Sequence, residues 1–445
     1  MKKLFFAAAV FATVAMYSCV TSEIGSDVVV EGKPTTMAIS IIGATPTKAS
    51  LVDEAPETGE SDYSGNALVV IFNNANQLET WSSAPASGGY STVVNTTTGL
   101  KRVYVLLNIP STATITTTAG LSRAAFEKEL NALTSAQIAT VPSFFLTNVA
   151  TPAQVILEQN VTDPLTELKN IVKVNVGRVA AKVRVEFNAP LANQDKGSLT
   201  NIEYKVKNVI SRTQTIGYWN AGILETAFFN DVPTGLPAPN PVYDFSNYTT
   251  ELPGGGTPWA AVEDNINNVA VGSSPKQYPL ENTNAVPREG NTTRVVVKAQ
   301  FHPYVWTDGT DGSSGATPSG DGSIWLVQDY NGLVKGYANS DPIGQGWLVT
   351  TVGQEDVVTP YPQGICYYNK VWIADMSEAG ATMRYATIRN HSYRVNITSV
   401  SGIGDSLEDG DIDVDKPIVE ETNMVAEITV LQWSFINLDT GLEGI

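Results

Sequence analysis

Short segments of β-branched and alternating apolar residues recur along this chain and limit what it can fold into. Turn residues separate them, which is typical of β-strands joined by loops. One stretch has a helical period instead, because Ser122 can cap a helix in which Phe126, Leu130 and Leu133 recur at i, i+4 and i+7. The sequence therefore predicts a mainly all-β fold, with this helix over residues 122–133 and a second short one within 165–172. The expected strands cover residues 37–42, 67–72, 102–107, 172–187, 202–210, 294–301, 324–327, 365–373, 393–400 and 425–436.

The length of 445 residues is sufficient for about two or three domains, each with its own core. Apolar residues make up 42 % of the chain, which excludes a disordered protein. No repeat of roughly 20–50 residues is present, which disfavours a solenoid or a propeller. A long β run ends at Phe187 and is followed by Asn188-Ala189-Pro190, so we place a boundary there, between residues 19–188 and 189–445.

The first residues form an export signal. Lys2 and Lys3 precede an apolar run over residues 4–16, and Cys19 closes the segment. This arrangement resembles a lipoprotein signal, in which residues 1–18 are removed and Cys19 is acylated, with palmitate among the acyl groups. The alternative is a secretory signal cut near Ser18, with Cys19 incidental. No later apolar run approaches the length of a membrane-spanning helix, so we expect attachment to the outer membrane at the cell surface through lipid alone.

Charge and composition exclude several functions. The net charge of −18 and the pI of about 4.5 suit neither a nucleic acid nor an anionic lipid surface. Two His and two Cys exclude Cys-rich zinc modules and sites with three His ligands. No HExxH, P-loop or GxSxG motif occurs, so we expect no enzyme, no cofactor and no metal site. Cys366 lies in an apolar run and is expected to be a small core residue.

The segment 405–423 is acidic and precedes the last expected strand. Its evenly spaced carboxylates are of the kind that Ca²⁺ prefers, but the central Gly and terminal Glu of an EF-hand loop are missing. We therefore expect a solvated acidic linker, with calcium binding left open. The spaced carboxylates are those of Asp409, Asp411, Asp413 and Asp415.

The order of several segments resembles that of a known family. A first strand MAISIIG (37–43) is followed by VYVLLNIP (103–110), the helix SRAAFEKELNAL and VGRVAAKVRV (176–185). The second half contains TTRVVVKAQF (292–301), ICYYNKVWI (365–373), IRNHSYRVNITSVSGIG (388–404) and MVAEITVLQW (424–433). This series resembles the FimA/Mfa-type fimbrillins, the stalk subunits of type V pili. The AEITVLQW ending and the acidic segment before it favour the Mfa branch.

The resemblance implies two β-sandwich-like domains in tandem and assembly by strand exchange. In the family, a protease removes the first strand after export, and the C-terminal strand of a neighbouring subunit fills the groove. For this chain the first strand corresponds to residues 36–43, the cleavable loop to 44–65 and the donor strand to 423–438. The implied partners are copies of the chain itself, anchor and tip fimbrial subunits and the maturation protease. The implied role is a fimbria that supports adhesion and colonisation.

Both terminal strands offer side chains that could serve this exchange. In the first strand, Met37, Ile39 and Ile41 share one face. In the last strand, the expected anchors are Leu431, Trp433 and Phe435 on one face and Ile428 and Val430 on the other. The alternative is that each strand simply pairs within its own chain. A donor-like last strand favours a stalk subunit over a tip subunit, which has nothing further to donate to.

The cleavage point departs from the family pattern. The family is cut after an Arg in the loop that follows the first strand, but no Arg occurs between Cys19 and Leu100. Lys48 has the same charge and lies among Pro, Thr and Ser, so we expect a cut between Lys48 and Ala49. Because Lys lacks the planar fork of Arg, this cut requires a protease that accepts Lys. Another point in the loop, or an uncut subunit, is the alternative.

Two other functions remain open from the sequence. One is a surface glycan-binding lipoprotein with a β-sandwich fold, since eight Trp could form a platform that stacks on sugars. Trp325 and Trp372 lie inside β runs, however, where core packing is the default. The other is a secreted hydrolase with paired carboxylates, but no spacing selects a pair among the 45 acidic residues.

Overall fold

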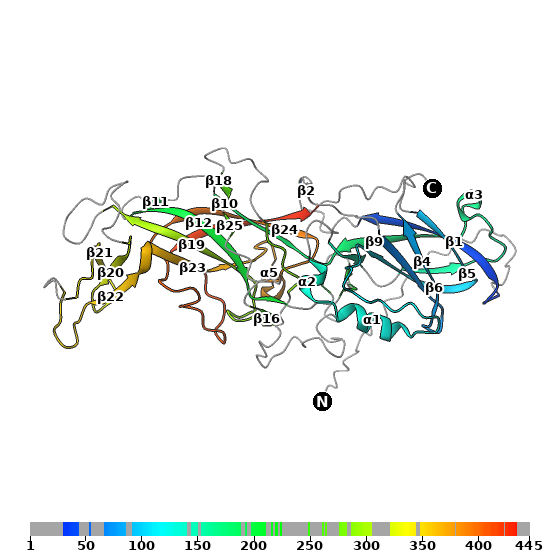
Figure 1. Cartoon of the computed structure of the whole chain (residues 1–445), viewed down its shortest axis with the longest axis horizontal. Coiled ribbons are helices and arrows are strands. Elements are labelled where there is room, and N and C mark those ends of the chain that lie inside the picture. Colours follow the sequence, from blue (N-terminus) through cyan, green and yellow to red (C-terminus); the bar gives the residue numbers. More distant parts are fainter. Residues whose placement is uncertain are drawn as a thin grey trace, which may run out of the picture.

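The protein is an elongated, mainly β-structure with its first strands at one end and the strands within residues 324–361 at the other (Figure 1). The all-β expectation is confirmed. The computed structural model describes residues 30–43, 53–54, 66–85, 91–139, 144–149, 153–187, 192–193, 197–210, 215–216, 219–220, 223–224, 248–249, 260–261, 263–264, 276–282, 286–304, 321–343, 348–378, 380–421 and 423–433.

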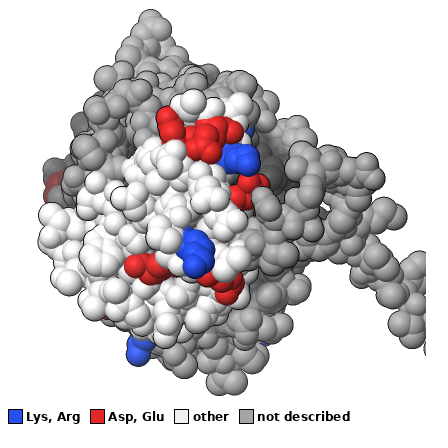
Figure 2. Space-filling model, turned by 90° about the vertical axis from the view of Figure 1, so that its right-hand side faces the viewer, with Lys and Arg blue, Asp and Glu red and all other residues white. Residues whose placement is uncertain are grey.

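The N-terminal part is built on one eight-stranded sheet of order β4-β3-β6-β7-β9-β1-β5, with β8 paired to β6. One face of this sheet carries a core of Val, Ile and Leu side chains, and the other is covered partly by helix α1. Among the described residues on the end of the molecule formed by this part, Figure 2 shows few charged side chains. The strands are β1 (Pro34–Gly43), β3 (Asn66–Phe72), β4 (Leu78–Pro85), β5 (Ser91–Thr97), β6 (Gly99–Leu107), β7 (Leu146–Asn148), β8 (Ala153–Leu157) and β9 (Ile171–Arg178).

Helix α1 (Arg123–Asn131) confirms the helical period seen in the sequence. The Ser122 hydroxyl accepts a hydrogen bond of 3.2 Å from the Ala125 N–H and so caps the first turn. Phe126 is fully buried, with its ring 5.4 Å from that of Phe72 and 5.3 Å from that of Tyr104. These ring contacts hold the helix on the sheet.

The second expected helix is much shorter than residues 165–172. Helix α3 (Pro164–Glu167) ends because Leu168 adopts a left-handed backbone conformation, with φ of 54°. Strand β9 then begins at Ile171, which takes the remaining apolar residues into the sheet. Two other short helices are α2 (Ser135–Ile138) and α5 (Ala381–Arg384), and η2 (Pro362–Gly364) is a single 3₁₀ turn.

The C-terminal part packs two larger sheets around one core. One has the order β18-β10-β24-β25-β2, the other β11-β12-β19-β23 with β17 paired to β12, and a third sheet β21-β20-β22 lies at the far end (Figure 1). Two two-stranded ribbons, β13-β16 and β14-β15, complete the described strands. The strands of these three sheets and two ribbons are β2 (Asp53–Glu54), β10 (Lys182–Phe187), β11 (Ala192–Asn193), β12 (Gly197–Lys207), β13 (Val209–Ile210), β14 (Trp219–Asn220), β15 (Ile223–Leu224), β16 (Tyr248–Thr249), β17 (Ala260–Ala261), β18 (Glu263–Asp264), β19 (Arg294–Pro303), β20 (Ile324–Gln328), β21 (Val334–Ala338), β22 (Val357–Tyr361), β23 (Ile365–Trp372), β24 (His391–Val400) and β25 (Met424–Trp433).

The chain passes from the first part to the second within the β run expected over residues 172–187. That run forms two strands, because β9 belongs to the N-terminal sheet and β10 pairs in parallel with β24 of the C-terminal sheet. The residues between them are fully buried, and the Ala181 N–H donates to the Pro279 carbonyl at 2.8 Å. The boundary expected after Phe187 thus falls at the end of β10, whereas the chain changes sheets between Arg178 and Lys182.

Candidate assembly site

Strand β1 lies inside the N-terminal sheet, paired antiparallel with β5 and parallel with β9. Met37 and Ile39 are 0 % exposed and Ile41 is 1 % exposed, so the three residues expected on one face do form a buried row. Ala38 and Ser40, on the opposite face, are also buried. Because both edges of β1 are paired, its removal would leave a strand-shaped slot between β5 and β9 with unpaired backbone groups on both walls.

The beginning of β1 is held by polar contacts that sequence patterns did not suggest. The Asn170 side-chain amide donates to the Thr35 hydroxyl and to the Thr36 carbonyl, each at 3.0 Å. The Thr35 hydroxyl in turn donates to the Glu158 carbonyl, and the Thr36 hydroxyl to the Val161 carbonyl, each at 2.9 Å. A buried Asn just before β9 therefore fixes the register between β9 and the first strand.

Strand β25 pairs antiparallel with β24 of its own chain, from Met424 opposite Val400 to Gln432 opposite His391. Ile428 and Val430 pack against the C-terminal core, whereas Val425 on the other face is 50 % exposed. Among the described strands, the outer edge of β25 is paired only at residues 432–433, by β2. The described donor anchors, Ile428, Val430, Leu431 and Trp433, thus lie on a strand that pairs within its own chain.

The end of β25 lies at the junction of the two parts. Trp433 is 1 % exposed and belongs to the core on the α1 side of the N-terminal sheet. Its ring is 4.9 Å from that of Phe144 and is stacked on that of Tyr278 at 5.6 Å. Leu431 is also buried, at 7 % exposure. The side chains of Leu431 and Trp433 are therefore both buried within the described chain.

Arg178 connects this aromatic cluster to the first strand. Its guanidinium carbon lies 4.1 Å from the centre of the Trp433 ring, and its Nη1 donates to the Trp433 carbonyl at 2.8 Å. The Asn390 carbonyl accepts from the Trp433 N–H at 3.3 Å. Arg178 ends β9, and β9 pairs with β1 as far as Val176 opposite Gly43. One strand thus touches both candidate assembly strands.

Several expected site residues lie outside the described ranges. These are Cys19, Lys48, Ala49 and Phe435. The residues that surround Trp433 were missed because no local pattern links them, and Arg178 is one of several charged residues in its β run. No helix among the described residues is long and apolar enough to cross a membrane.

The C-terminal segment matches a family model. Residues 359–439 match the C-terminal domain of fimbrillin, the major fimbrial subunit protein type IV. Within these residues the chain is therefore similar to the C-terminal domain of fimbrillins. This confirms the family recognised from the ordered segments, and the family is one of fimbrial subunits rather than of enzymes. The assignment to the Mfa branch stays a prediction.

Solved structures similar to this chain come from Parabacteroides distasonis and Porphyromonas gingivalis. A protein assigned to cell adhesion from Parabacteroides distasonis is 15 % identical, with coverage of 91 % of this chain and 100 % of that one and a TM-score of 0.49. A fimbrilin of Porphyromonas gingivalis is 15 % identical, with 92 % and 100 % coverage and a TM-score of 0.43. A tip fimbrial protein of the same species is 12 % identical, with 90 % and 100 % coverage and a TM-score of 0.40. A comparison with curated proteins finds no match. All three TM-scores lie below 0.5, so the function proposed below rests on the family match and on the contacts of this chain.

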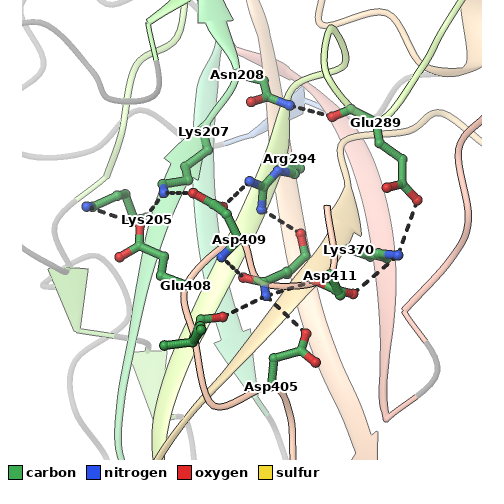
Figure 3. A network of polar contacts seen from close by, with 12 residues as sticks. Lys205, Lys207, Asn208, Glu289, Arg294, Lys370, Asp405, Glu408, Asp409 and Asp411 are labelled. Carbon is green, nitrogen blue, oxygen red and sulfur yellow. Dashed lines mark hydrogen bonds and ion pairs between the residues drawn. The ribbon is translucent and has the colours of Figure 1, made fainter. Parts of the chain in front are cut away.

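The acidic segment 405–423 is not the solvated linker expected from its sequence. It folds back onto β12, β19 and β23, where basic side chains meet it (Figure 3). Asp409 accepts from Lys207 at 2.6 Å and forms an ion pair with Arg294, whose side chain is only 2 % exposed. Asp411 pairs with Lys370 at 3.2 Å. The carboxylates therefore neutralise buried cations, a role that the local sequence could not reveal.

The pKa values of two carboxyl groups in this segment are shifted in opposite directions. Burial tends to raise the pKa of Asp409, but the charges of Arg294 and Lys207 outweigh it and hold this pKa below its usual range. Burial, together with a hydrogen bond to the neighbouring carboxyl of Asp411, raises the pKa of Asp405 to about 7. Asn369 lies between these two carboxyls and donates to Asp405 at 3.1 Å and to Asp411 at 3.0 Å. Within the described ranges, no group of three or more His, Cys, Asp or Glu is placed to hold a metal ion.

The two Trp considered for a sugar platform are integrated into the fold. Trp372 is 4 % exposed, and its indole N–H donates to the Val419 carbonyl at 2.6 Å, which confirms it as a packing residue. Trp325 lies on β20 and is partly buried. Cys366 is fully buried, as expected of a core residue, and burial raises the pKa of its thiol to about 12.

Proposed function

We propose that this chain is a structural subunit of a surface fimbria and polymerises by strand exchange once its first strand has been removed. The observation that carries the proposal is the position of β1, which is paired on both edges and buried on both faces yet lies close to the start of the described chain. A cut in the segment after Gly43 separates this strand from the rest of the fold without breaking any other strand of the N-terminal sheet.

Removal of β1 makes the binding of a replacement strand strongly favourable. Burial of a large apolar side chain contributes roughly 1.5–3 kcal/mol, and Met37, Ile39 and Ile41 all leave the core together. A strand donated by a second copy restores both the backbone pairing and the apolar contacts. Such a contact is heterologous, because it joins the last strand of one copy to the groove of the next, and it therefore propagates into a filament.

The donor is proposed to come from residues 423–438, and the structure indicates what its release requires. Residues up to Trp433 already pair with β24, so their donation means that Leu431 and Trp433 leave their own subunit. Residues after Trp433 carry Phe435 and further apolar side chains at Ile436 and Leu438. Donation of that last portion leaves the intramolecular part of β25 in place.

Export and maturation complete the proposal. We propose that residues 1–18 are removed, that Cys19 is acylated and holds the precursor at the outer membrane, and that a protease that accepts Lys then cuts between Lys48 and Ala49. The further partners are anchor and tip subunits of the same fimbria, and the role at the cell surface is adhesion and colonisation.

A controlled cut tests the assembly step. In a Cys19→Ala chain purified in the uncut form, residues 46–50 are replaced with the recognition sequence of a site-specific protease. We expect the uncut chain to stay monomeric and the cut chain to lose β1 and to form ladders that resist SDS. A copy with a scrambled recognition sequence is the matched control. Cut chains that release β1 and stay monomeric would sink the proposal.

The maturation steps are tested on cells. We expect Cys19→Ala to abolish acyl labelling and Lys48→Ala to leave the precursor uncut, while Lys33→Ala leaves both unchanged. Amino-terminal sequencing of fimbrial subunits is expected to begin at Ala49. Filaments whose subunits still contain residues 36–43 would refute removal of the first strand.

A further inference from the structure

A two-residue strand links the segment after the first strand to the end of the last strand. β2 lies between β1 and β3, in the segment proposed to be cut. It pairs in parallel with the end of β25, with Asp53 opposite Gln432 and Glu54 opposite Trp433. In Figure 1, β2 accordingly lies beside the tip of the β25 arrow. Among the described strands, β2 is the one that covers the outer edge of β25.

This pairing is supported by chain connections on both sides. β2 is joined to β1 through residues 44–52 and to β3 through residues 55–65, and both of those strands belong to the N-terminal sheet. Two backbone pairs are weak by themselves, but a double tether keeps the segment close to its partner at little extra entropy cost. A cut on the β1 side leaves β2 held through β3 alone, so the unpaired state gains freedom and the pairing weakens.

We propose that β2 is a catch that holds the end of the C-terminal strand in the uncut subunit, and that cleavage between β1 and β2 releases it. The proposal rests on the strand exchange described above and adds an order of events to it. The single cut that allows β1 to leave its groove also loosens the donor strand. An uncut subunit therefore has neither an open groove nor a released donor strand. The partner of the catch is the chain's own last strand, at Gln432 and Trp433.

A reversible crosslink tests the catch. The double variant Asp53→Cys/Gln432→Cys joins the paired residues, since neighbouring strands lie about 4.8 Å apart and a disulfide spans Cα atoms about 4.4–6.8 Å apart. The chain carries Cys19→Ala and the inserted protease site, and Cys366 is buried with a thiol that stays protonated. We expect the oxidised, cut variant to form at least about tenfold less polymer than the same sample after reduction.

A matched pair controls for the cysteines themselves. Asp53→Cys/Val425→Cys places the second thiol on an exposed position of the same strand, away from the β2 pairing, and should neither crosslink nor respond to reduction. Failure of the Asp53/Gln432 pair to crosslink in the uncut chain would overturn the proposal. Equal polymer in the oxidised and reduced states would overturn it as well.

A second readout separates this proposal from the proposed function. Amide hydrogen exchange is measured over residues 424–433 in the uncut and cut chains, at a concentration too low for polymer. We expect exchange of the Gln432 amide, which faces the β2 side of β25, to become at least about fivefold faster on cutting, whereas the Trp433 amide, bonded to the Asn390 carbonyl, and the amides of residues 394–397 in β24 keep their rates. Unchanged exchange would reject the catch even if filaments form. Faster exchange without filaments would support the catch and reject strand exchange.

Discussion

Arg178 stacks over the ring of Trp433 at 4.1 Å and donates a 2.8 Å hydrogen bond to the carbonyl of the same residue. The first of these residues ends a strand that pairs with β1, and the second ends the last described strand. The side chain of Arg178 is fully buried, so both its charge and its contacts are removed from water. The contact is therefore a buried junction between β9, the parallel neighbour of β1, and β25, rather than a surface ion pair.

The contributions of Arg178 and Trp433 to the free energy of unfolding should therefore be coupled. We expect Trp433→Ala to lower the free energy of unfolding by about 3–5 kcal/mol, because a fully buried aromatic side chain is lost. Arg178→Ala should cost about 2–4 kcal/mol, and the double variant should cost less than the sum by about 0.5–3 kcal/mol. Urea unfolding of the uncut chain measures all three, with Val425→Ala as an exposed control on the same strand. Simple additivity would show that the two side chains act independently.

Two truncations separate the portions of the last strand. Deletion of residues 434–445 should leave a folded monomer with nearly unchanged melting, because β25 and Trp433 remain. After the cut, this monomer should no longer form ladders if the donor lies beyond Trp433. Deletion of residues 424–445 should in addition expose the C-terminal core that Met424 and Ile428 cover, and lower the melting temperature by several degrees. Thermal melting and sedimentation distinguish the outcomes, and normal ladders from the shorter deletion would place the donor within β25.

The docked acidic segment predicts unequal effects of two Lys substitutions. Lys207 is 5 % exposed and pairs with Asp409 at 2.6 Å, so Lys207→Met should destabilise the fold by about 2–4 kcal/mol, because Asp409 is then left with Arg294 and Glu408 with Lys205 as their remaining cationic partners. Lys416 pairs with Asp413 at 3.0 Å but is 65 % exposed, and Lys416→Met should change stability by less than about 0.5 kcal/mol. Denaturant unfolding compares the variants. Equal changes in the free energy of unfolding for the two variants would show that the acidic segment is a solvated linker and does not stabilise the fold.

The raised pKa of Asp405 predicts a specific pH dependence. The folded state keeps a proton on this carboxyl up to about pH 7, while the unfolded chain loses it near the ordinary value for Asp. Folding therefore takes up a proton between these values, and this group lowers stability progressively as the pH rises from about 4 to 7. We expect Asp405→Asn to remove this part of the decline, so that its melting temperature exceeds that of the wild type above pH 7. Melting curves from pH 5 to pH 8 measure the effect, and Asp415→Asn, in the same segment but exposed, should follow the wild type.

Much of the fold could be predicted from local patterns of apolar residues in the sequence. The strands expected over residues 37–42, 67–72 and 294–301 are observed with ends shifted by a few residues, because apolar alternation depends only on neighbours in the sequence. The Ser122-capped helix was predictable for the same reason. Strands β4 and β5 were missed, since LETWSSAP and STVVNTT contain many Ser and Thr and are strands because β3 and β1 pair with them.

The sequence by itself determined that this chain is β-rich, which segments form most of its strands and to which family its ordered motifs belong. Only the tertiary structure decided which strands are neighbours. Arg178 and Trp433 are 255 residues apart, and Lys207 and Asp409 are 202 apart, yet each pair is in contact. Such contacts depend on how whole sheets pack and on which buried charges need partners, and no window of neighbouring residues contains that information.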